Sequence, residues 1–149
     1  MNTQINTNKG QMNTNILYKD LSYEVQGAFY EVFNKYGRGF KEGIYQKALA
    51  EEFDKRHLSF EREKRIVIHS IDTGKSLGVY VPDFLIEDKI IVEIKATDFT
   101  IRDNLKQHMS YLKAGQYEIG YLVNFGTPRL YIKRTIYTND RKPWLWKHK

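Results

Sequence analysis

The segment that decides the fold is YVPDFLIEDKIIVEIKA, residues 80–96, in which two apolar runs flank a charged turn. Such a pattern predicts a hairpin of two antiparallel strands. Because side chains alternate between the two faces of a strand, Glu93 and Lys95 share one face while Ile94 points to the other. The hairpin places both charges beside Asp83, near the end of the preceding strand. An otherwise apolar strand therefore carries a charged group of each sign on one face.

Charged side chains within such a strand need a partner, because burying an unpaired charge is costly. Asp83, Glu93 and the backbone carbonyl of Ile94 form the all-oxygen ligand set that Mg²⁺ or Mn²⁺ prefers. Beside such an ion, Lys95 would position or deprotonate a nucleophile, or stabilise charge during hydrolysis of a phosphodiester. A salt bridge between Glu93 and Lys95 at a sheet edge explains the same spacing equally well. Spacing alone leaves both interpretations open.

Apolar periodicity on either side of the hairpin predicts the remaining elements. Three helices are expected, the first ended by Gly37 and the third by Gly115. The helices are predicted at about Leu21–Tyr36, Glu42–Phe53 and Arg102–Ala114. Three sequential antiparallel strands are expected at Arg65–His69, Leu77–Ile86 and Ile90–Ala96, and two more at Ile119–Phe125 and Leu130–Ile136. The predicted order is α-α-β-β-β-α-β-β.

Length and composition limit the classes of protein that fit. A chain of 149 residues is the size of one domain, expected here at 16–137, between a disordered polar leader, 1–15, and a basic aromatic tail, 138–149. The absence of cysteine excludes disulfides and thiolate zinc sites. No apolar run approaches the roughly 20 residues that cross a bilayer, so a cytoplasmic protein without a membrane partner is expected. The net charge of +6 favours polyanionic partners, although a solvated basic face explains it about as well.

Several motifs resemble those of a known group of enzymes. Pro82-Asp83 followed by Glu93-Ile94-Lys95 resembles the PD-(D/E)xK nuclease signature. Residues 39–45, GFKEGIY, resemble the Gly-x-x-Glu-x-x-Tyr element of the GxxExxY family, a branch of that superfamily. The resemblance continues through residues 80–86, 92–96, 107–112 and 120–126, in consistent order, and covers roughly Leu21–Ile136.

The resemblance implies an α/β protein of the α+β type, with a restriction-endonuclease-like mixed sheet flanked by helices. The first two helices would cover one side of the sheet and Arg102–Ala114 the other. It also implies an enzyme that uses Mg²⁺ or Mn²⁺ to hydrolyse phosphodiester bonds of nucleic acid, with DNA favoured. Whether a homodimer forms stays open.

The resemblance further implies site residues outside the hairpin. Glu42 would be the helical acid that reaches the metal or its waters, although an acid that complements the helix dipole explains it too. Gln107 and Tyr111 match the Gln-x-x-x-Tyr element of RecB-like nucleases, where these residues contact DNA or brace the site. A buried Gln-Tyr pair that satisfies itself is the alternative. His108 has no metal-ligand spacing and is expected on a helix face or at the surface.

Two other functions fit the same residues. A non-catalytic nucleic-acid-binding module would keep the nuclease fold without turnover. A structural or interaction protein would use the acidic residues only as an ion-pair network. Dependence of cleavage and stability on Mn²⁺ separates the three functions.

Overall fold

The structure is a computed structural model that describes residues 17–98 and 102–146. The predicted polar leader, residues 1–15, lies outside the described residues. No helix in the described part of the chain is long and apolar enough to cross a membrane.

The chain begins with two helices joined by a short connection. α1 spans Lys19–Tyr36 and ends at Gly37, whose φ of 64° is the left-handed conformation that glycine adopts most easily. Helix α2 spans Glu42–Lys55. The first buries Val25, Ala28, Phe29 and Val32, and the second buries Tyr45, Leu49 and Phe53. These are the helical spacings that the sequence predicts, so both helices present an apolar face to the sheet.

Five strands form the main sheet in the order β1-β4-β5-β6-β7. The strands are β1 Phe60–Arg62, β4 Phe84–Ile86, β5 Ile90–Lys95, β6 Ile119–Asn124 and β7 Tyr131–Ile136. β5 and β6 pair in parallel and the other neighbours pair antiparallel. A parallel pair needs a crossover, which α3, Arg102–Ala114, provides. The predicted mixed sheet flanked by helices is confirmed.

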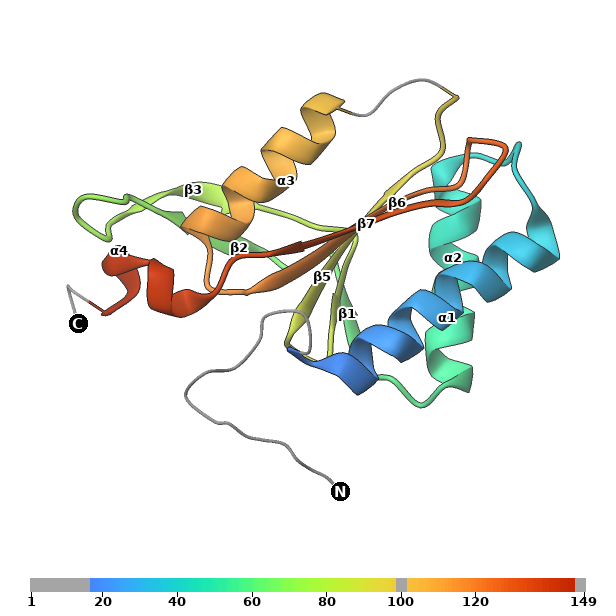
Figure 1. Cartoon of the computed structure of the whole chain (residues 1–149), viewed down its shortest axis with the longest axis horizontal. Coiled ribbons are helices and arrows are strands. Elements are labelled where there is room, and N and C mark those ends of the chain that lie inside the picture. Colours follow the sequence, from blue (N-terminus) through green and yellow to red (C-terminus); the bar gives the residue numbers. More distant parts are fainter. Residues whose placement is uncertain (1–16, 99–101, 147–149) are drawn as a thin grey trace.

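The sheet separates two apolar layers (Figure 1). On one side, Ile90, Val92 and Ile94 of β5 pack in the same cluster as the buried faces of α1 and α2. On the other side, Ile91 packs with Leu112 of α3. The two N-terminal helices therefore cover one face and α3 the other, as predicted.

The segment between the first helices and the hairpin differs from the prediction. The single strand expected at Leu77–Ile86 is two strands, because Pro82 cannot donate a ladder hydrogen bond. Its first part, β3 (Ser76–Tyr80), pairs with β2 (Ile66–His69) in a separate two-stranded ribbon, and its second part, β4, pairs with β5. The short edge strand β1 is absent from the prediction. The strands before β5 therefore do not form one continuous antiparallel run.

The C-terminal residues pack against the end of α3. A 3-10 turn at Asn139–Arg141 leads into the short helix α4, Pro143–Trp146. The Lys142 ammonium is buried and donates to the carbonyls of Gly115 and Tyr117, both at 2.8 Å. The Trp144 indole N–H donates to the Lys113 carbonyl at 3.0 Å. Basic and aromatic side chains of the tail thus satisfy carbonyls at and after the end of α3.

Candidate active site

The site begins where the pairing of β4 and β5 stops. The last paired residues are Phe84 and Val92, and the same register would place Pro82 opposite Ile94. Proline has no N–H, so the ladder cannot continue at that position. The Ile94 N–H instead donates to Oδ2 of Asp83 at 2.7 Å. The Pro-Asp dipeptide therefore replaces one ladder step with a carboxylate and opens a fork between the two strands.

The backbone of Ile94 faces this fork. The Phe125 N–H donates to the Lys95 carbonyl at 2.9 Å, so the polar backbone groups of Lys95 point to β6. Successive residues of a strand direct their backbone groups to opposite sides, and the carbonyl of Ile94 therefore points toward Asp83. Because Pro82 offers no donor there, the carbonyl keeps its lone pairs for another ligand. A carbonyl and a carboxylate thus lie on the same side of β5.

The first turns of α2 reach the fork from the other layer. The Gln46 side chain donates to Oδ1 of Asp83 at 3.0 Å and accepts a hydrogen bond from Arg62 at 3.2 Å. The Arg62 guanidinium also lies 5.1 Å from the centre of the Phe84 ring. Glu42 precedes Gln46 by four residues and so shares its helix face. These contacts hold Asp83 through both of its oxygens.

The carboxyl groups at the fork carry unfavourable negative charge. Burial raises the pKa of Glu93 to about 7, and the charge of Asp83 adds to the increase, whereas Lys95 opposes it. Burial also raises the pKa of Asp83, against the Ile94 hydrogen bond that lowers it. Glu42 raises the pKa of both groups, which places all three carboxylates within electrostatic reach of one another. Lys95 is the cation on the same strand, so the site favours additional positive charge.

The connection from α1 to α2 is fixed by the residues of the GFKEGIY element. The Tyr45 hydroxyl donates to the Gly37 carbonyl at 2.6 Å and accepts from the Phe40 N–H at 3.3 Å. The Tyr45 ring stacks on Phe125 at 4.5 Å. Gly39 adopts a φ of 115°, which a residue with a side chain rarely adopts. The tyrosine thereby ties down the loop that leads to Glu42.

Comparison with models of protein families identifies the family of the chain. Residues 19–135 match the PD-(D/E)XK nuclease superfamily. The matched region contains every helix and strand from α1 to β7, except for Ile136, the last residue of β7. The chain belongs to the PD-(D/E)XK nuclease superfamily. Searches of curated proteins and of solved structures gave no significant match. Members of this superfamily are generally nucleases that use divalent metals.

The donor set at the fork suits a divalent ion of this nuclease superfamily. It offers carboxylates of Asp83 and Glu93 and the carbonyl of Ile94, all of them oxygen ligands. Within residues 17–98 and 102–146, no three His, Asp or Glu side chains form a group that could hold a metal ion. Glu42 therefore influences the site electrostatically without completing a three-acid cluster. The arrangement fits an ion held by two carboxylates and one carbonyl, and the role of Glu42 at the metal stays a prediction.

Helix α3 contributes an aromatic contact to the candidate site. The Tyr111 ring stacks on the Tyr80 ring with 3.9 Å between centroids. The Tyr80 hydroxyl is buried without a well-oriented hydrogen-bond partner among the described residues. The hydroxyl lies close enough to Glu93 for each group to affect the pKa of the other. Burial raises the pKa of Tyr80 and the charge of Glu93 adds to the increase, whereas the Tyr80 hydroxyl partly offsets the increase in the pKa of Glu93. Tyr111 thus reaches the acidic residues through Tyr80.

The other predicted α3 residues lie differently. Gln107 is exposed, and the described part of the chain contains no hydrogen bond from it to Asp83 or Glu93. His108 is 2% exposed, and its buried ring packs against Gly120, where any side chain would collide with it. Burial lowers the pKa of His108 to about 4, so the ring is neutral near pH 7. The helix therefore directs His108 and Leu112 inward, and the role of Gln107 stays a prediction.

Two residues at the site are absent from the sequence-based candidates. Gln46 binds Asp83, and its position four residues after Glu42 on one helix face is a signal that the sequence contains. Tyr80 precedes Asp83 by three residues, but its neighbour Glu93 comes from another strand. Only the fork geometry brings these two together.

Proposed function

We propose that this protein is a divalent-metal-dependent nuclease that hydrolyses phosphodiester bonds of nucleic acid, with DNA as the favoured substrate. The observation that carries the proposal is the fork at Pro82, where Asp83, Glu93 and the Ile94 carbonyl gather beside Lys95. A structural salt bridge would need only Glu93 and Lys95. It would leave unexplained why a second, partly buried carboxylate lies there and why Gln46 orients it.

Mg²⁺ or Mn²⁺ would be held by Asp83, Glu93 and the Ile94 carbonyl, with Glu42 reaching it through water. When bound, such an ion supplies charge neutralisation at the phosphate and makes a water molecule a better nucleophile. Its presence would also offset the burial that raises the pKa of Glu93, so that this carboxyl group is ionised near pH 7. The site is therefore more stable with the ion than without it.

The side chains of the protein have separate tasks in this scheme. Lys95 places an ammonium beside the phosphate, where it stabilises the charge that develops as the bond breaks. Gln46 keeps Asp83 in one orientation by donating to Oδ1, while the Ile94 N–H holds Oδ2. Tyr111 fixes Tyr80, whose hydroxyl faces Glu93. We assign Gln107 to contact with the nucleic acid, which its exposure on α3 permits.

We further propose that the chain belongs to the GxxExxY branch of the superfamily. The support is structural as well as sequential, since each named residue of GFKEGIY has a task. Gly39 permits the loop conformation, Glu42 acts on the charges at the fork, and Tyr45 ties the loop to the helix.

The decisive experiment compares the parent protein with Lys95→Ala. Single-stranded, double-stranded and branched DNA and RNA are incubated with Mn²⁺ or with a chelator, and the products are resolved on denaturing gels. We expect Mn²⁺-dependent cleavage that falls roughly a hundredfold or more in Lys95→Ala, the scale for a lost acid-base or charge-stabilising group. Mn²⁺ should still raise the melting temperature of this variant, because lysine is not a ligand.

The matched control is Lys75→Ala, which removes an exposed lysine from the turn between β2 and β3. Its cleavage rate should equal that of the parent. Equal cleavage by Lys95→Ala and the parent would refute the proposed role of Lys95. Binding of nucleic acid without cleavage in any metal would identify the protein as a non-catalytic module that retains the fold.

A further inference from the structure

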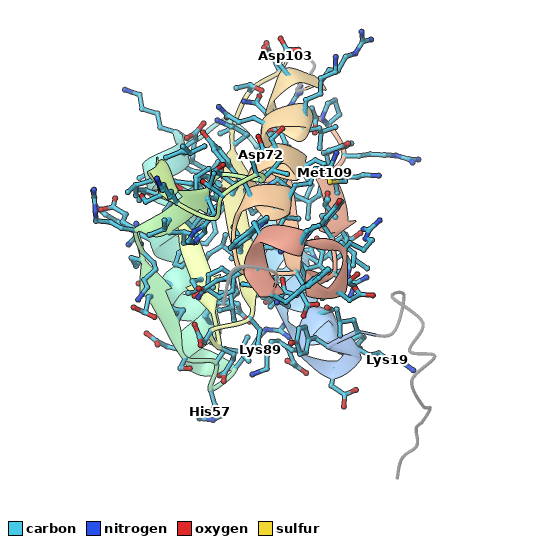
Figure 2. All side chains as sticks on the ribbon, turned by 90° about the vertical axis from the view of Figure 1, so that its left-hand side faces the viewer. Lys19, His57, Asp72, Lys89, Asp103 and Met109 are labelled. Carbon is cyan, nitrogen blue, oxygen red and sulfur yellow. The ribbon has the colours of Figure 1, made fainter. Side chains whose placement is uncertain are left out.

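A groove lies directly beyond the proposed catalytic residues. It has a volume of about 440 Å³, within the range of sites that bind small molecules. Its walls come from three connections, residues 38–40 between α1 and α2, residues 96–98 after β5, and Gly126 after β6. Figure 1 shows these three connections at the same end of the sheet. Figure 2 shows Lys89 of the β4–β5 turn and Asp103 at the start of α3 at opposite ends of the molecule. β5 ends at Lys95, one residue before Ala96 in the groove wall.

The groove contains an aromatic ring that the fold exposes rather than buries. Phe40 is 47% exposed although it belongs to a tightly held loop. Its ring meets Tyr36 and Tyr45 edge to face, with centroids 6.3 and 6.1 Å apart. Its N–H donates to the Tyr45 hydroxyl, which in turn donates to Gly37. The loop therefore fixes the position of Phe40 before any ligand arrives, and a ligand that stacks on it orders little protein.

The charges around Phe40 suit a nucleotide. Arg38 lines the same groove and is exposed, and it forms no ion pair with the described residues. The guanidinium group of such an exposed arginine is planar, and its N–H donors match the oxygens of a phosphate. Asp98 lines the opposite wall and offers acceptors for amino or hydroxyl groups. Aromatic, cationic and acceptor groups together correspond to base, phosphate and the polar edge of a nucleotide.

The groove adjoins the proposed site along the chain, although none of Asp83, Glu93 and Lys95 lines it. Ala96 in its wall directly follows Lys95, and Phe40 precedes Glu42 by two residues. Because consecutive Cα atoms lie about 3.8 Å apart, the Ala96 backbone in the groove wall lies next to that of Lys95, so a nucleotide in the groove would lie near the phosphate that we place at Lys95. A base within a duplex is stacked on both sides and cannot stack on Phe40.

We propose that this groove binds one unpaired nucleobase beside the hydrolysed phosphate, so that the substrate is single-stranded nucleic acid or a frayed end. The base stacks on Phe40 while Arg38 contacts a phosphate. This inference rests on the proposed nuclease function and names its substrate class.

Binding without turnover tests the groove separately from catalysis. Fluorescence anisotropy in the presence of a chelator measures the affinity of the full chain for a short single-stranded DNA, the matching RNA, and the duplex of the same sequence. Loss of one base–aromatic stack weakens binding by about tenfold or more. We expect this loss for Phe40→Ala with the single strands, and a change below about twofold with the duplex. Phe40→Trp, which keeps a stacking surface, should bind as the parent does.

Tyr30→Ala serves as the control, because it removes another half-exposed aromatic ring, from α1, outside the groove. Its affinity for every nucleic acid should match that of the parent. Equal loss for single strands and duplex in Phe40→Ala, or no loss at all, would overturn the proposal. The melting temperature of each variant verifies that it is folded.

Cleavage with Mn²⁺ then separates the two claims. Substrates with a single abasic position moved along the strand should be cut poorly by the parent at one position next to the cut, and Phe40→Ala should lose this dependence. Cleavage that ignores both the abasic position and Phe40 would reject the groove and retain the nuclease. Single-strand binding that depends on Phe40, with no cleavage in any metal, would retain the groove and reject the nuclease.

Discussion

The two faces of β5 carry side chains of opposite character, apolar on one face and partly charged on the other. Ile90, Val92 and Ile94 point into the layer beneath α1 and α2 and are buried. On the other face Ile91 is apolar, but Glu93 and Lys95 follow it and meet Asp83 and Tyr80. The first face stabilises the fold by removing apolar area from water, and the second holds charges at a cost. The alternation of side chains along one strand thus separates the residues that stabilise the fold from those that we propose for function.

The largest effect is expected for Asp83→Asn. The substitution keeps the shape of the side chain but removes the negative charge, and its single amide oxygen can accept from only one of the Ile94 N–H and the Gln46 side chain. Turnover should fall about 10²- to 10³-fold. The rise in melting temperature that Mn²⁺ causes in the parent should disappear with it, which differential scanning fluorimetry measures. If Mn²⁺ still raised the melting temperature of Asp83→Asn, the metal would bind elsewhere. The charged face of β5 would then not be the metal site.

The apolar face should show a large effect on stability and none on the chemistry. Ile90 is fully buried at the start of β5, away from the fork. Ile90→Ala should lower the unfolding free energy by about 2–5 kcal/mol in urea titrations. Its turnover per folded molecule should equal that of the parent. Glu93→Ala should do the reverse, lowering turnover with a much smaller loss of stability, and the opposite ranking would contradict the division between faces.

The pH dependence of stability should differ between the parent and Glu93→Gln. Burial raises the pKa of Glu93 from its ordinary value near 4.5 to about 7, so the folded protein binds this proton more tightly than the unfolded chain. The contribution of Glu93 to the unfolding free energy is therefore greatest below pH 4.5 and is lost as pH rises through about 7. In metal-free urea titrations, Glu93→Gln should be more stable than the parent at pH 8 and nearly equal to it at pH 4.5.

Comparing the two proteins at each pH also removes the contribution of His108. Its pKa is lowered, so its contribution to stability is lost as pH falls, the opposite direction to Glu93. A gap between parent and Glu93→Gln that did not change with pH would show that Glu93 is not held in a buried, acidic environment.

The smallest effect is expected for Tyr80→Phe. The Tyr80 hydroxyl lowers the pKa of Glu93, so its removal should raise that pKa, measured by carbon-detected NMR titration of the glutamate carboxyl group. The unfolding free energy should change by less than about 1 kcal/mol, because the ring and its stack on Tyr111 remain. Tyr111→Phe is the control, since it retains the stack and removes a hydroxyl that is not among the groups that shift the pKa of Glu93. An unchanged pKa in Tyr80→Phe would exclude contact between the two groups.

Patterns within single elements made most of the fold predictable. The periodicity of residues 102–114 gives α3 with the bounds that the structure has, and Gly37 ends α1 as expected. The division at Pro82 was missed because residues 77–86 are apolar enough to form one strand, and only the pairing partners separate them. β1 has three residues, two of them charged, and thus no period to detect.

At the site, too, residues that are close in sequence could be predicted, and contacts between distant segments could not. Asp83, Glu93 and Lys95 are close in sequence, and hairpin pairing suffices to join them. Gln46 and Tyr80 meet the fork through tertiary packing, which depends on how α2 and the ribbon dock on the sheet. His108 was expected on a helix face or at the surface, and its burial depends on the missing side chain of Gly120. Contacts between distant segments therefore mark the limit of prediction from one sequence.

The residues after the matched region limit where the chain can be truncated. The family match ends at residue 135, before Lys142 and Trp144. Those two side chains supply the donors for three backbone carbonyls, of Lys113, Gly115 and Tyr117. A chain trimmed to the matched region would keep every proposed catalytic group and yet release the end of the helix that carries Tyr111. The match to the superfamily therefore ends before residues that pack against α3, and a truncation or fusion at residue 135 would remove these three hydrogen bonds.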